Sequence, residues 1–382
     1  MANTLNDFSS TELARYARHI SIPEFGMQGQ QKLKAAKVLV IGAGGLGSPV
    51  LLYLAAAGVG TIGIVDFDVV DDSNLQRQVL YTVADIGQPK ATTAKKRLEA
   101  LNPHINIQVH NTAFTTDNAL SIIQDYDIVA DGTDNFPTRY LTNDACVLAG
   151  KVNVYASIYR FEGQVSVFNY LDENGERGPN YRDLFPKPPP PGMVPSCAEG
   201  GVLGVLPGII GSLQANEVIK IITGVGKTLS GRLFLFDAAA FTTRTLKVKK
   251  RPDTLIKELI NYEQFCGIVP KPATNTMVKE ITVTELKKWM DEEKDFQLVD
   301  VRKQFEWDIA NLDAELIVLD TLPKNVEKIN KDKPVVIHCR SGARSANAIS
   351  FLQDNYGYTN LLNLKGGILA WANEIDDTMA TY

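Results

Sequence analysis

The stretch AKVLVIGAGGLG, residues 36–47, decides the fold of the first part of the chain. It opens with AKVLVI, a run that is apolar apart from Lys37, as a buried parallel strand requires. Glycines at the spacing G-x-G-x-x-G follow, before a segment of helical character. Glycine lets the backbone turn sharply and approach a phosphate, and a helix N-terminus favours negative charge. We therefore predict a nucleotide-binding turn containing Gly42, Gly44, Gly45 and Gly47.

Strands and helices alternate outward from this turn. Strands are predicted at 61–66, 105–109 and 127–130, helices at 49–58 and 89–100, and a first helix with a capping box from Ser9 to Glu12. This alternation indicates an α/β, doubly wound, Rossmann-like domain. A strand at 165–170 precedes PKPPPPG at 186–192, where consecutive prolines favour an exposed crossing loop.

A second domain follows within the 382 residues, which are comfortable for two domains. The alternation fades after about residue 236, and PKPATNT at 270–276 is typical of an interdomain linker. Strand and helix signals then resume in a smaller α/β unit. We predict one domain at 1–250, a linker at 251–277 and a second domain at 278–382.

Composition excludes several classes of protein. A net charge of -5 argues against a general nucleic-acid binder. The four cysteines are too few and too widely spaced for a disulfide framework, and none has C-x-x-C spacing. The N-terminus lacks a signal-peptide pattern, and polar residues interrupt the most apolar run, 201–222, so we expect neither a leader nor a membrane span. A cytoplasmic setting is predicted.

Polar residues cluster beyond the second predicted strand. Asp66 ends that strand, where an acidic side chain can hold ribose hydroxyls. The glycine motif alone fits an NAD-dependent oxidoreductase equally well. Arg77 and Lys90 favour a phosphoryl-type reaction, because cations offset the repulsion between a carboxylate and a triphosphate; alternatively, both are solvated surface charges. The nucleotide contacts predicted here are Asp66, Asp68, Asn74, Arg77, Gln78 and Lys90.

A second acidic segment, DGTDN at 131–135, follows the strand predicted at 127–130. Ligands of open α/β sheets bind at the C-terminal ends of parallel strands. Asp134 could hold Mg²⁺, which prefers carboxylate and phosphate oxygens. We therefore add Asp134 and Asn135 to the predicted site, with a turn-capping role as the alternative.

Five ordered motifs resemble the MoeB/ThiF adenylyltransferases, relatives of ubiquitin-activating enzymes, over about residues 8–250. The motifs are GAGGLG at 42–47, DFD at 66–68, SNLQRQ at 73–78, GQPK at 87–90 and TDN at 133–135. By this resemblance Asp66 binds ribose and Asp134 is the Mg²⁺-linked catalytic aspartate. The phosphate-binding residues implied are Asn74, Arg77 and Lys90.

The resemblance also implies a reaction and an assembly. The C-terminal Gly-Gly carboxylate of a ubiquitin-like sulfur-carrier protein attacks the α-phosphate of ATP, giving an acyl-adenylate and pyrophosphate. Arg18 matches the family arginine that reaches into the partner subunit's ATP site, which implies a homodimer. From the residues alone, Arg18 is equally a polar-face helix residue.

Cys197 follows the proline run, and the resemblance to relatives that carry a second domain implies that a cysteine here attacks the acyl-adenylate or bonds transiently to the carrier. The alternative is a small residue packed under a loop. Many relatives also bind structural zinc with two C-x-x-C pairs. The first pair aligns with Asn180 and Asp183, and the second, expected at 251–254, is absent. We predict no zinc site.

The segment VVIHCRSGARS, residues 335–345, carries a second chemical signal. An apolar strand leads into Cys339, a short loop and an arginine that opens a helix. Loop N–H groups form an anion cradle, and the helix dipole with Arg344 is expected to lower the thiol pKa. Only four residues separate Cys339 from Arg344, which suits a persulfide sulfur better than a phosphate. The predicted persulfide loop is Cys339, Arg340, Ser341, Gly342, Ala343, Arg344 and Ser345.

This second region resembles a rhodanese over about residues 278–376. DVR at 300–302 and GGILAW at 366–371 match its usual motifs, whereas its Gly-His-Ile is replaced by DIA at 308–310. The combined prediction is an enzyme that adenylylates a carrier and converts it to a thiocarboxylate, with a sulfur donor such as a cysteine desulfurase. The alternatives are a regulatory nucleotide-binding module with an inactive rhodanese, and an NAD-dependent oxidoreductase. The sequence leaves the pathway open among molybdopterin, thiamin, cysteine and tRNA sulfur.

Overall fold

The chain forms two compact units, residues 1–269 and 270–382. The structure, a computed structural model, describes residues 8–189, 200–267 and 278–381. Residues 251–267 belong to the first unit, where Tyr262 and Cys266 are buried in its core. The predicted linker therefore begins inside this unit, because apolar side chains anchor that segment to α6 (Phe136–Leu148).

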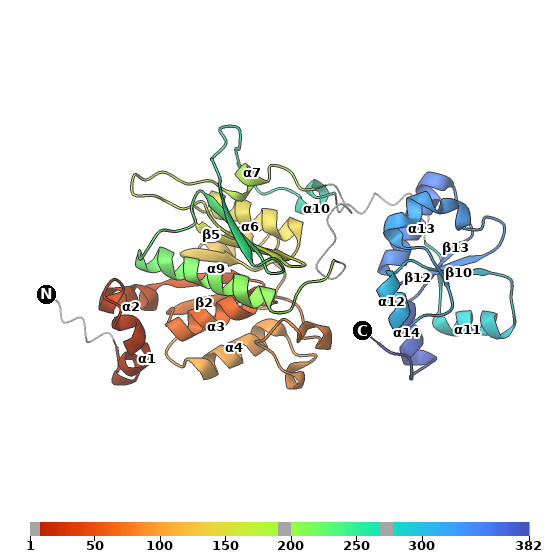
Figure 1. Ribbon diagram of the computed structural model, residues 1–382, viewed down its shortest axis with the longest axis horizontal. Helices are drawn as coiled ribbons and strands as arrows, with labels where there is room; N and C mark the ends of the chain where they lie inside the picture. The colour runs from red at the N-terminus through yellow and green to blue at the C-terminus, as the bar shows by residue number, and fades with distance from the viewer. Residues whose placement is uncertain (1–7, 190–199, 268–277, 382) are drawn as a thin grey trace. The chain divides into compact units, whose positions relative to one another are not determined.

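The first unit is built on one eight-stranded sheet (Figure 1). In sheet order the strands are β3 (Asn106–His110), β2 (Thr61–Val65), β1 (Lys37–Ile41), β4 (Ile128–Asp131), β5 (Val152–Tyr159), β6 (Glu162–Phe168), β7 (Arg232–Asp237) and β8 (Thr242–Lys247). The first five are parallel and the last three antiparallel. The doubly wound prediction is confirmed, with the direction of winding reversing between β1 and β4.

Helices cover both faces of this sheet because its central strands are apolar on both sides. Along β1, Val38 and Val40 pack into one core, whereas Leu39 and Ile41 pack into the other. The first core contains residues of α2 (Gly26–Ala35), α3 (Gly47–Ala57), α4 (Lys90–Leu101) and α9 (Leu206–Thr223). The second contains residues of α5 (Ala119–Ile123), α6, α7 (Tyr181–Leu184) and α10 (Tyr262–Phe265). Two 3₁₀ turns, η2 (Asp72–Asn74) and η3 (Val83–Asp85), follow β2.

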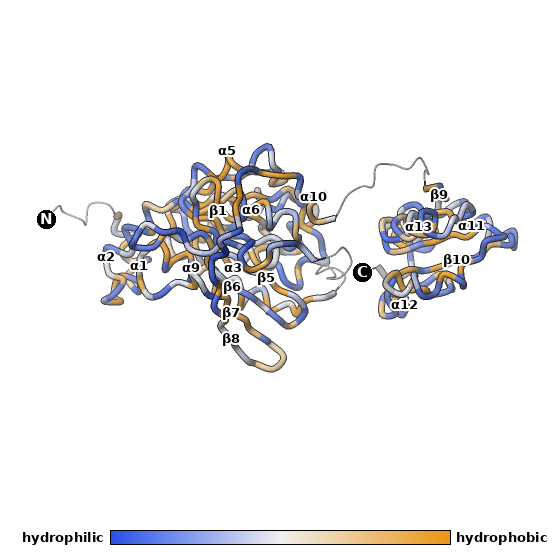
Figure 2. The backbone as a smooth tube through the Cα atoms, turned by 90° about the horizontal axis from the view of Figure 1, so that it is seen from above, coloured by the Kyte–Doolittle hydropathy of each residue, from blue (hydrophilic) through white to orange (hydrophobic). Residues whose placement is uncertain are grey.

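Local signals located most of these elements, but not all. The capping box at the start of α1 (Ser10–Ile20) is confirmed, since Glu12 accepts the Ser9 N–H at 2.8 Å and Ser9 Oγ accepts the Glu12 N–H at 3.2 Å. The strand predicted at 165–170 is β6, and β5, β7 and β8 were not predicted. β8 is exposed along its whole length in a hairpin that projects from the unit, so it has no apolar pattern to detect (Figure 2).

The second unit has a five-stranded parallel sheet. Its strands in sheet order are β11 (Glu315–Leu316), β10 (Gln297–Asp300), β12 (Val335–His338), β13 (Leu361–Leu364) and β9 (Glu280–Ile281). Residues of α13 (Ala343–Tyr356) pack on one face, and residues of α11 (Val283–Asp291) and α14 (Gly367–Glu374) on the other. The remaining elements are α12 (Gln304–Ile309), η4 (Leu319–Lys324) and η5 (Val326–Lys328). Among the described residues, no helix has the length and apolar character needed to cross a membrane.

Candidate functional site

A cavity of about 380 Å³ opens at the ends of β1, β2 and β4, where the first sheet reverses its winding. Ligands of doubly wound sheets bind at this point. Glycine is required here for close packing: a Cβ on Gly42 would lie 3.0 Å from the Gly132 carbonyl oxygen. A Cβ on Gly47 would lie 1.9 Å from the Gly42 carbonyl oxygen. The glycines thus bring the start of α3 against the ends of two strands.

Three of the four predicted glycines, Gly42, Gly44 and Gly45, line this cavity. Gly47 is buried beneath it and serves the packing of α3. Gly42 has a φ of +88°, a conformation that glycine adopts without strain.

Asp66 fastens the glycine turn to the end of β2. Its carboxylate accepts the backbone N–H of Ala43 at 2.7 Å and that of Asp68 at 2.8 Å. Burial raises the pKa of Asp66, and the two N–H groups oppose that rise. Asp66 also lines the cavity, and the two hydrogen bonds fix the orientation of the carboxylate that is predicted to contact ribose.

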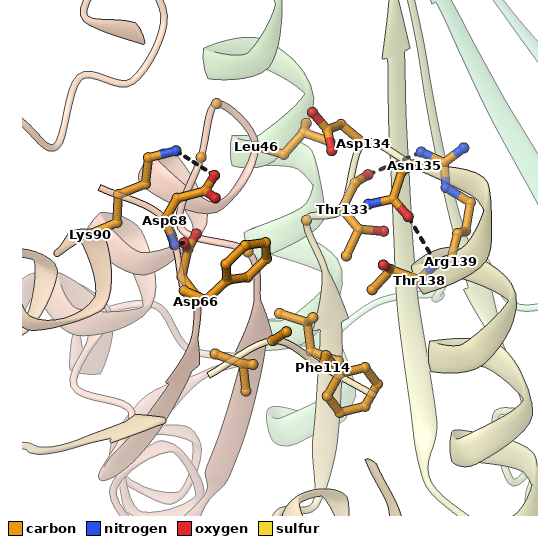
Figure 3. A pocket seen from close by; sticks show the side chains of 18 of the residues that line it. Leu46, Asp66, Asp68, Lys90, Phe114, Thr133, Asp134, Asn135, Thr138 and Arg139 are labelled. Atoms are coloured by element: carbon orange, nitrogen blue, oxygen red, sulfur yellow. Dashed lines mark hydrogen bonds and ion pairs between the residues drawn. The ribbon is translucent and has the colours of Figure 1, made fainter. Parts of the chain in front are cut away.

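Lys90 lies at the first position of α4 and is only 5% exposed. Its ammonium group pairs with the exposed carboxylate of Asp68 at 3.0 Å, on one side of the cavity (Figure 3). A buried cation requires an anionic partner. Because Asp68 reaches into solvent, an anionic ligand in the cavity can share or replace this partner.

Arg77 and Gln78 line the cavity from the segment after η2. Arg77 donates to the Ser73 carbonyl oxygen at 3.0 Å. Gln78 is buried, and its Oε1 has no hydrogen-bond partner among the described residues. Asn74 is half-buried outside the cavity lining, where its amide donates to Ser73 Oγ at 3.5 Å. Arg77, Gln78 and Lys90 therefore all line the cavity, whereas Asn74 does not.

Asp134 and Asn135 line the opposite wall from Asp66 and Lys90 (Figure 3). Asn135 accepts the Thr138 N–H at 2.9 Å and caps α6, so the predicted capping alternative holds for this residue. Asp134 is exposed to the cavity. Beneath it, Asp131 is fully buried, and burial raises the pKa of its carboxyl group.

The sequence prediction missed part of the wall. Phe67 and Phe114 supply apolar surface, and Arg139 lines the same wall as Asp134. Phe114 follows β3, and the C-terminal end of a parallel strand was the available signal. Arg18, by contrast, is exposed on α1 and does not line the cavity.

The sulfur loop of the second unit also follows a central parallel strand. Cys339 comes directly after β12 and is 1% exposed. The Gly342 N–H donates to its Sγ at 3.2 Å, and Ser345 Oγ lies 3.4 Å from the same sulfur. The predicted cradle is therefore present in part, closed around one sulfur atom. Arg340 is half-buried, whereas Ser341 and Ala343 are exposed.

Arg344 makes a paired contact with Glu306 of α12, at 2.6 and 2.7 Å. The sequence prediction gave Arg344 the task of lowering the thiol pKa and did not include Glu306. This nearby carboxylate offsets the charge of Arg344, so the guanidinium ties α13 to α12.

The first residues of α14 form backbone hydrogen bonds with the sulfur loop. Ile368 donates its N–H to the Cys339 carbonyl oxygen at 2.9 Å, and Leu369 donates to that of Arg340 at 3.1 Å. A Cβ on Gly367 would lie 2.4 Å from the Cys339 carbonyl oxygen. The glycine pair at 366–367 thus permits this close backbone contact.

A buried charged pair supports the same loop. Asp300 and Arg302, both 0% exposed, are joined at 2.6 Å. Arg302 also donates to the Ala310 carbonyl oxygen at 2.7 Å, which fixes the turn where the usual rhodanese Gly-His-Ile is absent. His338 lies beside the pair, 3.7 Å from Asp300, and burial lowers its pKa to about 4.

The residues aligned with the relatives' zinc ligands do not fit a zinc ion. Asp183 accepts the backbone N–H and side-chain amide of Asn180 at 2.7 and 2.9 Å, and the backbone N–H of Arg251 at 2.9 Å. No group of three or more His, Cys, Asp or Glu suited to a metal occurs in the part of the chain that the structure describes. A buried carboxylate joins the two segments here.

The other cysteines differ in their surroundings. Cys146 is fully buried in α6, and burial raises its pKa well above its ordinary value. Burial also raises the pKa of Cys266, to about 11. Cys197 lies outside the described residues, so its role stays a prediction.

Each of the two units matches a known protein family. The ThiF family matches residues 16–257, and the rhodanese-like domain matches residues 282–374. A probable adenylyltransferase/sulfurtransferase MoeZ of Mycobacterium tuberculosis is 51% identical over 379 residues, which cover 98% of this chain and 96% of that protein. A sulfur carrier protein adenylyltransferase of Thermus thermophilus is 53% identical over 268 residues, 68% of this chain and 99% of that protein.

Among solved structures, one of E. coli MccB with MccA-N7isoASN has the same fold as the first unit. Its TM-score is 0.57 at 22% sequence identity, with 65% of this chain and 75% of that chain covered. The two family matches and the nearly full-length likeness to MoeZ show that the chain belongs to the ThiF family, in the two-domain form that combines an adenylyltransferase domain with a rhodanese-like domain.

Proposed function

We propose that the first unit adenylylates the C-terminal Gly-Gly carboxylate of a ubiquitin-like sulfur-carrier protein, and that the second unit supplies the sulfur that converts it to a thiocarboxylate. The names of the relatives support both halves, since one acts on a sulfur carrier protein and another is an adenylyltransferase/sulfurtransferase.

The observation that carries the proposal is the charge arrangement of one cavity. Arg77 and Lys90 line it from two segments, and Asp134 lies on the opposite wall. A redox cofactor has little need for two extra cations beside its phosphates. A carboxylate that attacks a triphosphate does need them, because two anions must approach one another and pyrophosphate must leave with its charge stabilised.

The lining suits the parts of ATP. The glycine turn and the start of α3 can offer N–H groups to phosphates. Asp66, which lines the cavity, is the candidate ribose contact, and Phe114 is a candidate apolar surface for the base. Asp134 is the candidate Mg²⁺ ligand, in the usual mode of one carboxylate together with phosphate oxygens. A bound Mg²⁺ would supply charge that offsets the developing negative charge on the phosphates.

The proposed reaction has two stages. The carrier carboxylate forms a bond to the α-phosphorus as the bond to pyrophosphate breaks, giving an acyl-adenylate. Cys339 meanwhile takes the outer sulfur of a donor, such as the persulfide of a cysteine desulfurase, and the donor thiolate leaves. The outer sulfur of the persulfide then displaces AMP from the acyl-adenylate, which leaves the carrier joined to Cys339 through an S–S bond. A reducing thiol attacks Cys339 Sγ and breaks that bond, so the carrier leaves as a thiocarboxylate, and a second thiol reduces the resulting mixed disulfide and restores Cys339. Cys197 is a candidate for a transient bond to the carrier.

Three further features belong to this proposal. Arg18, exposed on α1, is available to a partner subunit's ATP site in a homodimer. The free thiol of Cys339 suits a reducing cytoplasm. No structural zinc is needed, since Asp183 already joins the segments that zinc joins in relatives.

The test is carrier-dependent ATP–pyrophosphate exchange. The wild-type chain with Mg²⁺ and its carrier, identified by pull-down, should exchange, and Asp134→Ala should lower the rate about 100-fold or more. Asp117→Ala, an exposed carboxylate outside the cavity lining, is the matched control and should exchange normally. Undiminished exchange in Asp134→Ala would remove that residue from the site.

Absence of exchange with every carrier would instead favour a regulatory nucleotide-binding module. Binding of a nicotinamide cofactor by titration would favour an oxidoreductase. Both outcomes would overturn the proposed adenylylation.

A further inference from the structure

A buried amide lies beside the sulfur loop in a strand that is otherwise apolar. Asn363 is 4% exposed in β13, between Leu362 and Leu364. An apolar residue would suit this position in the core, since burying an amide costs free energy unless it is well hydrogen-bonded. The hydrogen bonds of the Asn363 side chain must therefore offset the cost of burying it.

The side-chain amide of Asn363 contacts the Ser345 hydroxyl, which lies next to the sulfur of Cys339. Ser345 Oγ lies 2.6 Å from Asn363 Oδ1, 3.1 Å from the Gly342 carbonyl oxygen and 3.4 Å from Cys339 Sγ. A serine hydroxyl has one proton to donate. Three acceptors thus surround one donor, and the shortest of these contacts is the one to Asn363.

The orientation of the Asn363 amide decides which of these three acceptors receives the Ser345 proton. Its oxygen and nitrogen exchange places when the group turns over about its last bond, so it can either accept from Ser345 or donate to it. When it donates, the Ser345 proton is released toward the sulfur. A hydrogen bond from a hydroxyl to an anion is stronger than one to a neutral acceptor, so an anionic sulfur favours this second arrangement.

We propose that Asn363 is a positioning residue of the sulfur site, whose amide orients the Ser345 hydroxyl to donate to Cys339 Sγ when that sulfur is a thiolate or persulfide. The inference rests on the proposed sulfur-transfer role of Cys339. It assigns to β13 a part in stabilising the anion, in addition to the loop N–H of Gly342.

A nearby asparagine shows the alternative, purely structural use of the same side chain. Asn360, just before β13, donates from its Nδ2 to the carbonyl oxygens of Asn330 and Lys333, at 2.9 and 2.5 Å. These are backbone groups of a turn, and the reactive sulfur is not among them. Asn360→Ala is therefore a matched control that removes hydrogen bonds without touching Ser345.

The main test variant is Asn363→Asp. Aspartate has nearly the same shape, but its ionised carboxylate only accepts hydrogen bonds, so it retains the Ser345 proton. The readout is the pH dependence of Cys339 alkylation by iodoacetamide in the full chain, followed by mass spectrometry of its peptide. The midpoint should rise by about one pH unit, with about tenfold lower kcat/KM for thiosulfate at neutral pH.

Two further variants separate a hydrogen-bond effect from others. Ser345→Ala should also raise the alkylation midpoint, and Asn363→Asp should add little to it in that background, because both act through one hydroxyl. Asn360→Ala should lower the melting temperature but leave the midpoint unchanged. A full additional shift in the Ser345→Ala background would mean that the new charge acts directly on the sulfur, which would overturn the proposal.

An unchanged midpoint in folded Asn363→Asp would also overturn it. If that variant does not fold, Ser345→Ala decides alone, and an unchanged midpoint there has the same consequence. The alkylation profile needs no turnover, so it stays informative if the wild-type chain shows no Cys339-dependent sulfur transfer, a result that would count against the proposed function instead.

Discussion

The two units place their candidate sites at equivalent points of a parallel sheet but enclose them differently. In the first unit, the turn after β1 opens into a cavity of about 380 Å³ lined by charged side chains from several segments. In the second, the loop after β12 closes around the sulfur of Cys339, a residue that is 1% exposed. The end of a strand and the start of a helix thus supply N–H groups in both units. The side chains around them differ: charged groups line the cavity of the first unit, whereas Gly342 and Ser345 contact a single sulfur atom in the second.

The sharpest way to test this comparison is to disable each site separately. Cys339→Ala should abolish thiosulfate:cyanide sulfur transfer and leave ATP–pyrophosphate exchange intact, because the nucleophile is lost. Lys90→Ala should lower exchange by about 100- to 1000-fold and leave sulfur transfer intact.

Arg97→Ala is the control for the lysine, since Arg97 lies on the same helix and pairs with Asp85 at 2.9 Å on the surface. It should exchange at the wild-type rate. Loss of both activities in either single-site variant would contradict the separation of the two sites.

The second prediction concerns the stability of the sulfur unit. His338 has an ordinary pKa of 6.5 that burial lowers to about 4, so the folded state binds its proton less readily than the unfolded state. The neutral, buried His338 therefore contributes fully to the free energy of unfolding above about pH 6.5. As the pH falls toward 4, this free energy decreases by about 3 kcal/mol, because the unfolded state binds the proton more tightly. Denaturant unfolding of the second unit between pH 7 and 4 measures it.

Removing the titrating group should remove this pH dependence. In His338→Phe, the free energy of unfolding should change less between pH 6.5 and 4 than in the wild type. Asp300 and Arg302, which adjoin His338, remain in that variant. An unchanged slope would show that other groups account for acid sensitivity.

The third prediction returns to the first unit, at the place of the relatives' zinc ligands. Asp183→Ala leaves three donors, two on Asn180 and one on Arg251, without their acceptor. The expected loss is about 2 kcal/mol of unfolding free energy, seen as a lower melting temperature. Asp253→Ala, an exposed carboxylate that also pairs with Arg251, should have no measurable effect. A wild-type melting temperature that falls on adding a chelator would contradict the zinc-free proposal.

The smallest effect is expected at Glu306. Glu306→Gln removes the charge that pairs with Arg344 and leaves the chain folded, so kcat/KM for sulfur transfer should fall about tenfold as the start of α13 loosens. Asp308→Asn changes another carboxylate of α12, which contacts Gln304, and should behave as wild type. Equal activity of both variants would show that the Arg344 contact does not position the loop.

Several features of the molecule follow from local sequence. The apolar run and glycines of 36–47 gave β1, its turn and α3, because each depends on a few neighbouring residues. The clusters that contain Arg77 and Lys90 were also visible, since they follow a strand whose end was predictable. Asn74 was included with them on sequence proximity alone, and it does not line the cavity.

The contacts that the sequence did not predict join residues far apart in the chain. Glu306 contacts Arg344, 38 positions away, and Phe114 lines the cavity of the first unit because β3 lies next to β2 in the sheet. Such pairings depend on the order of strands, which the alternation of elements leaves undetermined.

The sequence by itself determined the class of each unit, the two reactive loops and the residue types available to them, because glycine spacing, a cysteine and periodic apolar residues act over short distances. Tertiary structure alone decided which side chains surround those loops. It placed Asp183 against Arg251 and Asn363 against Ser345. These contacts arise when the strands of one sheet bring together segments that are distant in the chain, and the energy that selects them comes from packing of the whole core.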